Sequence, residues 1–65
     1  MKEVVLKEYT SVAELAVLLE VPTVRIIKAA FEELGLLTTI NEVLAFNQAK
    51  LLAAQFGYRA RREGT

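Results

Sequence analysis

Residues 38–46 constrain the fold most, because they lie between a helix stop at Gly35 and a helix start at Asn47. The first part of this stretch is β-branched and favours an extended backbone. Asn41 and Glu42 fit a tight turn, since Asn tolerates left-handed backbone angles and bonds its own main chain. The remaining residues then return as a short strand. The sequence therefore predicts a β-hairpin between two helical halves.

A first helix is predicted at residues 12–19. Ser11 and Glu14 have the spacing of a capping box, in which the Ser hydroxyl accepts from the third helical N–H group. Apolar residues then recur at helical spacing. Pro22 cannot continue the helix, because it lacks the N–H group and its ring clashes with the preceding turn.

A second and longer helix should follow Pro22, with Thr23 as its N-cap. Gly35 supplies the left-handed residue that ends it. Apolar side chains at i, i+3, i+7 and i+10 predict one buried face. These residues are Val24, Ile27, Phe31 and Leu34.

The third helix is expected to begin after Asn47 as its cap and to end at Gly57. Its predicted core-facing residues are Leu51, Leu52 and Phe56. Two outer segments complete the pattern. Residues 3–7 are β-branched and apolar between charges, which is typical of an edge strand. Residues 58–62 alternate with period two, which also fits a last strand with its arginines outward.

Together these elements predict an α+β fold of order βααββα, with or without a final strand. Three helices would pack around the short hairpin. The chain has 65 residues, which allows one domain at most. We expect a single domain over residues 1–65 with an ordered core over about residues 3–62. A high apolar content of 54 % compensates for small size, or else keeps apolar surface for a partner.

Catalytic chemistry has little to build on in this chain. The sequence has no histidine and no cysteine, which removes the commonest general base and metal ligand. Glu32 and Glu33 are the one adjacent carboxylate pair, but neighbouring helix positions point about 100° apart. No phosphate-binding glycine loop occurs. We expect no enzyme activity, no cofactor and no metal site.

The charge balance argues against a strongly nucleic-acid-binding chain. Eight basic and eight acidic residues cancel, so no net positive charge is present to displace counterions. The basic residues that could still contact nucleic acid are Arg25, Lys28, Arg59, Arg61 and Arg62. The last three form a cluster that is either a phosphate-contacting patch on RNA or a solvated tail.

Membrane association is not expected. No apolar run approaches the roughly 20 residues that span a bilayer. The N-terminus lacks the layout of a signal peptide, whose apolar region covers about 7–15 residues. We therefore expect a cytoplasmic protein.

Two alternatives remain from the residues alone. The first two helices and their tight turn also fit a helix-turn-helix, with the hairpin in the place of a wing. Such a winged-helix-like DNA-binding domain would read bases with Thr23, Arg25, Lys28 and Glu32, although Asn, Gln or more Arg would be expected there. The other alternative is a protein-interaction or dimerisation module that uses apolar surface around residues 36–37 or 53–54.

A series of short motifs resembles a known family. Its most specific members, in order and spacing, are Leu34-Gly35, Thr39-Ile40-Asn41 and Phe56-Gly57. With these, the chain over about residues 10–58 is similar to the small N-terminal module of bacterial translation initiation factor 2. The sequence departs from that pattern at residues 36–38, where the family tends to have Val-Met-Ala, and at Ala45, where an acidic residue is common.

The resemblance implies an α+β module similar to the stem-contact folds of some aminoacyl-tRNA synthetases. It also implies a factor that binds GTP, initiator tRNA and the small ribosomal subunit through other domains, so no GTP-binding residue is carried over. We predict a non-catalytic, monomeric binding module of the translation initiation machinery, contacting the small ribosomal subunit through RNA or a ribosomal protein. The basic residues named above do not match fixed family positions, so their role rests on charge.

Overall fold

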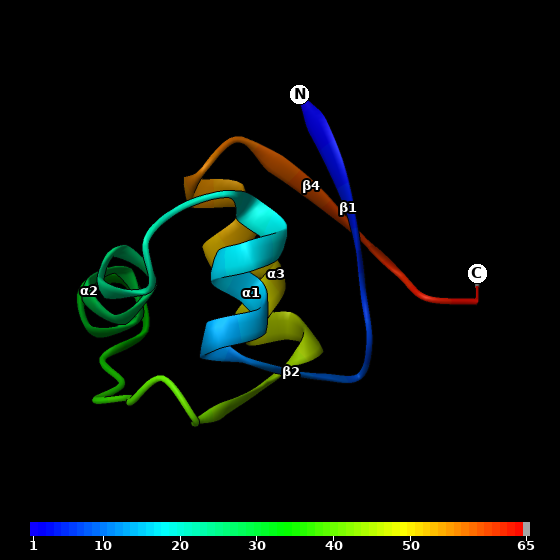
Figure 1. Ribbon diagram of the computed structural model, residues 1–65. Coiled ribbons are helices and arrows are strands. Elements are labelled where there is room, and N and C mark those ends of the chain that lie inside the picture. The colour runs from blue at the N-terminus through cyan, green and yellow to red at the C-terminus, as the bar shows by residue number, and fades with distance from the viewer. Residues whose placement is uncertain (65) are drawn as a thin grey trace.

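The computed structural model describes residues 1–64, which form three helices and four strands in an α+β arrangement (Figure 1). The elements are β1 (Lys2–Leu6), β2 (Tyr9–Ser11), α1 (Val12–Leu19), α2 (Thr23–Leu34), β3 (Val43–Ala45), α3 (Phe46–Gln55) and β4 (Tyr58–Arg62). The predicted fold class and three helices are confirmed, and the order of elements roughly matches. The first and last strands are both present. Thr65, the end of the predicted domain, lies outside the described residues.

The strands pair differently from the prediction. β1 and β4 form a parallel pair that aligns Lys2 with Tyr58 and Leu6 with Arg62. β2 and β3 form a separate antiparallel pair. Val43–Ala45 is therefore a strand, as predicted, but its partner is Tyr9–Ser11 and not residues 38–40. The predicted hairpin is wrong in this respect.

The segment before β3 caps α1 instead of forming a hairpin strand. The N–H of Val12 donates to the C=O of Glu42 (2.9 Å), and the N–H of Ala13 donates to the C=O of Ile40 (3.1 Å). The predicted cap is also present, since the N–H of Glu14 donates to Ser11 Oγ (3.0 Å). The first N–H groups of a helix have no partner inside it. Here each of these three finds an acceptor, which ties residues 40–42 to the start of α1.

The buried face of α2 is rotated from the predicted one. Ile26 and Ala30 are fully buried, whereas Val24 is 66 % exposed and Phe31 is 55 % exposed. Ile27 and Leu34 pack partly against the core. The helix carries more apolar side chains than one face can bury, so periodicity alone does not select the face. The buried face is selected by the packing of α2 against both α1 and α3, where the small side chain of Ala30 permits close approach.

α3 begins two residues earlier than predicted. Ala45 is its N-cap in place of Asn47, and the N–H of Ala45 donates to Gln48 Oε1 (3.0 Å). Phe46 is consequently the first helical residue, and it lies in the core. Leu52 is buried as predicted, but Leu51 is 55 % exposed, so its predicted core position is wrong.

The core lies between the helices and the parallel strand pair. In Figure 1, α2 lies on one side of α1 and α3, and the β1–β4 pair lies on the other. Every element contributes at least one buried side chain. The apolar members are Val4, Leu6, Val12, Leu15, Ala16, Leu19, Ile26, Ala30, Leu44, Phe46, Ala49, Leu52, Ala53 and Tyr58.

Gly35 ends α2 as the sequence predicts. Its φ of 67° is left-handed, and its N–H donates to the C=O of Phe31 (3.0 Å). The N–H of Leu36 then donates to the C=O of Ala30 (3.2 Å). The bond from Gly35 is the one that defines the αL capping motif, and the bond from Leu36 satisfies a further carbonyl group of the last turn.

Candidate binding surfaces

The outer face of β4 carries two of the predicted basic residues. Arg59 and Arg61 are exposed and alternate with the inward-facing Tyr58 and Ala60, as period two requires. Across the parallel pair, Arg59 aligns with Glu3 and Arg61 with Val5. The strand therefore holds two guanidinium groups on one face, two residues apart.

Arg62 has a different setting from its two neighbours. Its guanidinium carbon lies 4.0 Å from the centre of the Phe46 ring, and it forms an ion pair with Glu8. The side chain thus covers the start of α3 and ties it to the β1–β2 loop. The expectation that all three arginines point outward is wrong for Arg62.

Arg62→Ala is expected to lower the free energy of unfolding by about 1 kcal/mol, because it removes a cation–π contact and a partly exposed ion pair, each of which contributes about 1 kcal/mol or less. Urea unfolding followed by circular dichroism measures the change. Arg59→Ala, on the same strand, is the control and should change stability by less than about 0.5 kcal/mol. Equal effects of the two substitutions would contradict a structural role for Arg62.

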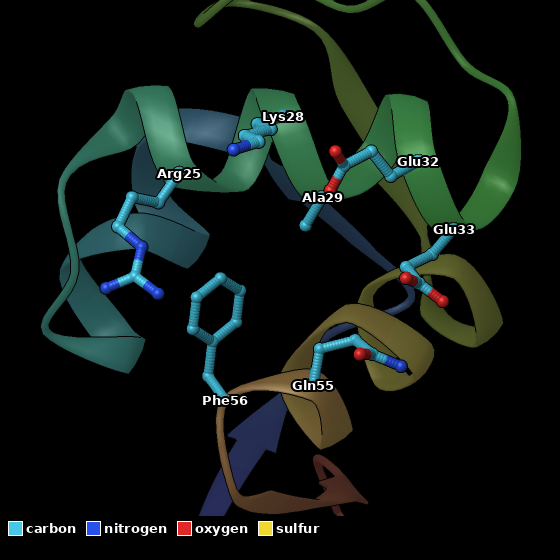
Figure 2. A pocket seen from close by; sticks show the side chains of 7 residues that line it. All are labelled: Arg25, Lys28, Ala29, Glu32, Glu33, Gln55 and Phe56. Atoms are coloured by element: carbon cyan, nitrogen blue, oxygen red, sulfur yellow. The ribbon is translucent and has the colours of Figure 1, made fainter.

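Arg25 and Lys28 lie on α2 beside a groove (Figure 2). The groove has a volume of about 220 Å³ and lies between α2 and the C-terminal end of α3. Its lining residues are Arg25, Lys28, Ala29, Glu32, Glu33, Gln55 and Phe56. It is open to solvent on one side, so it is a surface groove and not an enclosed cavity.

The groove has an apolar centre and charged ends. Figure 2 shows the Phe56 ring and the Ala29 methyl group facing each other across its middle, with Arg25 at one end and Glu33 at the other. The guanidinium carbon of Arg25 lies 5.4 Å from the centre of the Phe56 ring, within the range of a cation–π contact.

The five predicted basic residues therefore occupy three settings. Arg25 and Lys28 border the groove, Arg59 and Arg61 share the outer face of β4, and Arg62 packs on Phe46. Arg25 contacts Phe56 just after α3, whereas Arg62 contacts the first residue of α3. Because a helix rises about 1.5 Å per residue, these two arginines lie at opposite ends of α3.

The sequence pattern does not reveal the groove. It predicts Phe56 in the core, but that side chain is only partly buried and packs against the core from its edge. Gln55 and Ala29 carry no feature that marks them as lining residues. No local signal marks Phe56 as a lining residue, because its contact with Arg25 forms only when α2 packs beside the end of α3.

Metal binding and membrane crossing find no support in the described part of the chain. Within residues 1–64, no three His, Cys, Asp or Glu side chains gather where they could hold a metal ion. Over the same residues, no helix combines the length and the apolar character that crossing a membrane requires.

The helix-turn-helix alternative finds partial geometric support. α1 and α2 pack together across a short turn in which Glu20 has a left-handed φ of 59°. The segment after α2, however, forms no hairpin, since β3 pairs with β2. Among residues 1–64, the wing of a winged-helix domain is therefore missing from its expected place.

The fold and its surface define a small α+β module with an exposed basic strand face and a shallow groove. A family model described as the N-terminal region of translation initiation factor IF-2 matches residues 7–59. The chain belongs to this family, which confirms the resemblance of its sequence motifs. No curated protein matches the chain.

Proposed function

We propose that this chain is a non-catalytic, cytoplasmic binding module of the translation initiation machinery and that it contacts RNA of the small ribosomal subunit. The observation that carries the proposal is the family match over residues 7–59. The resemblance implies a factor that binds the small ribosomal subunit, whose RNA presents many phosphate groups.

The outer face of β4 is the surface that we assign to this contact. Arg59 and Arg61 are both exposed there. Arginine presents a planar fork of donors that matches a phosphate group with two parallel hydrogen bonds. The chain as a whole has no net charge, so local placement of these two residues must supply the attraction.

Titration of fluorescently labelled 30S subunits with the module tests the proposal. Wild type should bind, and Arg59→Ala with Arg61→Ala should weaken binding. The slope of log K against log salt should fall by about 1 for each phosphate group that the variant no longer neutralises. Lys7→Ala with Lys50→Ala, which removes two exposed cations outside β4, is the matched control and should bind as wild type does.

Three outcomes would count against the proposal. Absence of binding at low salt, both for the module and for a factor that contains it, would overturn it. An unchanged salt slope in the double variant would overturn the role of β4. Equal salt-dependent affinity for random duplex DNA would favour the helix-turn-helix alternative instead.

A further inference from the structure

We propose that the groove between α2 and the end of α3 binds a peptide segment of a protein partner, in which an apolar side chain lies between an acidic and a basic residue. This site is separate from the β4 face to which we assign RNA. The proposal rests on the charge order of the groove, on its apolar centre and on the position of its charges along α2.

The charges of the groove are sorted by sign. Arg25 and Lys28 border one end, and Glu32 and Glu33 border the other. At about 1.5 Å per residue, the α2 backbone advances about 12 Å from the first of these residues to the last. Ion pairs within residues 1–64 join Lys2 to Glu20 and Arg62 to Glu8. None of the four groove charges takes part in them, and the contact of Arg25 is with the uncharged Phe56 ring, so a partner can still supply the opposite charges.

This order of charges is the reverse of what α2 itself would favour. A helix is stabilised by acidic residues near its N-terminus and basic residues near its C-terminus, because of its macrodipole. α2 has no acidic residue in its first turn and no basic residue in its last turn. Arg25 lies in the first turn and Glu33 in the last. The macrodipole of α2 therefore does not explain the pattern, whereas complementarity to a partner does.

The centre of the groove suits an apolar side chain. The ring of Phe56 and the methyl group of Ala29 form its two walls, as Figure 2 shows. Its volume of about 220 Å³ is smaller than the roughly 300–1,000 Å³ of small-molecule pockets. Gln55 adds an amide with both donors and acceptors, which can pair with the backbone of a bound peptide.

Charge complementarity favours a peptide over RNA at this site. Two carboxylates at one end would repel a phosphate backbone, and the four charges sum to zero. A segment with an acidic residue beside Arg25 and a basic residue beside Glu33 would be attracted at both ends. Such complementarity selects partners and fixes their register.

The test uses the isotope-labelled chain and three synthetic helical peptides observed by two-dimensional NMR. Each peptide has a central leucine flanked one turn away on either side by glutamate and lysine, by two glutamates, or by two lysines. The first peptide should shift amide signals of the residues that line the groove, and the other two should shift them at least about 5-fold less at equal concentration, as expected when one end meets a like charge.

Glu32→Lys with Glu33→Lys gives the decisive variant. This variant should no longer bind the mixed-charge peptide and should bind the peptide with two glutamates. Its melting temperature should stay level or rise, because lysine suits the C-terminal end of α2. Glu42→Lys with Glu63→Lys makes the same change in net charge elsewhere and should keep the wild-type preference. If both double variants changed their peptide preference in the same way, the effect would be generally electrostatic and the proposal would be overturned.

Other results would also overturn it. One is that millimolar mixed-charge peptide shifts no amide signals. Another is that an oligoribonucleotide shifts the signals of the groove residues more than the peptide does. A third is that these signals shift with protein concentration in the absence of any ligand, which would indicate that a second copy of the chain binds there. The 30S titration is run in parallel on the same variants. If the wild-type chain binds the ribosome but not the mixed-charge peptide, only the groove proposal is contradicted. If it binds the peptide but not the ribosome, only the RNA contact is contradicted.

Discussion

Leu52→Ala is expected to lower the free energy of unfolding by about 2–5 kcal/mol, the usual range for truncating a buried leucine. Leu52 is fully buried on α3, the helix that contacts α2, both strands of the parallel pair and β3. A domain of 65 residues has a stability of about 0.05–0.15 kcal/mol per residue. The substitution should therefore leave a large fraction of molecules unfolded at physiological temperature.

Leu51→Ala is the matched control for this prediction. Leu51 is the preceding residue on the same helix and is 55 % exposed, so its truncation should cost about 1 kcal/mol or less. Urea unfolding of both variants, followed by circular dichroism, gives the two values. A larger loss for Leu51 than for Leu52 would show that α3 presents a different face to the core.

Ile26→Ala should also destabilise the fold by about 2–5 kcal/mol. Ile26 is fully buried on the face of α2 that packs against α1 and α3. The cavity left behind cannot be filled by its neighbour Ala30, whose methyl group is too short to reach into it. Thermal and urea unfolding should both report the loss.

Phe31→Ala is the control here, because the sequence pattern assigns Phe31 to the core. Its side chain is 55 % exposed, and we expect a loss of about 1 kcal/mol or less. The comparison therefore tests the observed rotation of α2 directly. A loss above about 3 kcal/mol for Phe31, with a small one for Ile26, would restore the face predicted from periodicity.

Local signals were predictable from the sequence because their physics involves only a few neighbouring residues. The Ser11 cap, the break at Pro22 and the left-handed end at Gly35 all follow from single side chains and backbone angles. The choice of helix face was harder. α2 has apolar residues on several sides, and only packing against α1 and α3 determines that Ile26 is buried and Val24 is not.

The pairing of the strands could not be predicted from the sequence. β1 and β4 come from opposite ends of the described chain, and nothing local marks them as partners. The hairpin prediction followed the general preference of neighbouring strands for each other. It failed because the carbonyl groups of Ile40 and Glu42 accept from the start of α1, which leaves β3 to pair with β2.

The two candidate surfaces also differ in how far the sequence predicts them. The outward position of Arg59 and Arg61 follows from the period of a strand and was predictable. The groove was not, because Arg25 on α2 and Phe56 beyond α3 meet only after the helices pack. The separation of basic from acidic residues along α2 is visible in the sequence. Only the packing of Phe56 beside them shows that they border a groove.

The motifs that revealed the family have identifiable structural roles. Gly35 closes α2, and Ile40 supplies a carbonyl acceptor to the start of α1. Phe56 forms a wall of the groove, and Gly57, with a left-handed φ of 84°, leads into β4. The resemblance therefore reported mainly on how the chain folds, and one of its residues also lies at a candidate binding site.

The parallel pairing of β1 with β4 has a mechanical consequence. Lys2 and Arg62 lie at opposite ends of the pair, since Lys2 aligns with Tyr58 and Leu6 with Arg62 (Figure 1). Tension applied between the two ends would load the interstrand bonds in shear, so that they must rupture together instead of one after another. Within a longer polypeptide, the module would therefore resist stretching far better than its small size suggests.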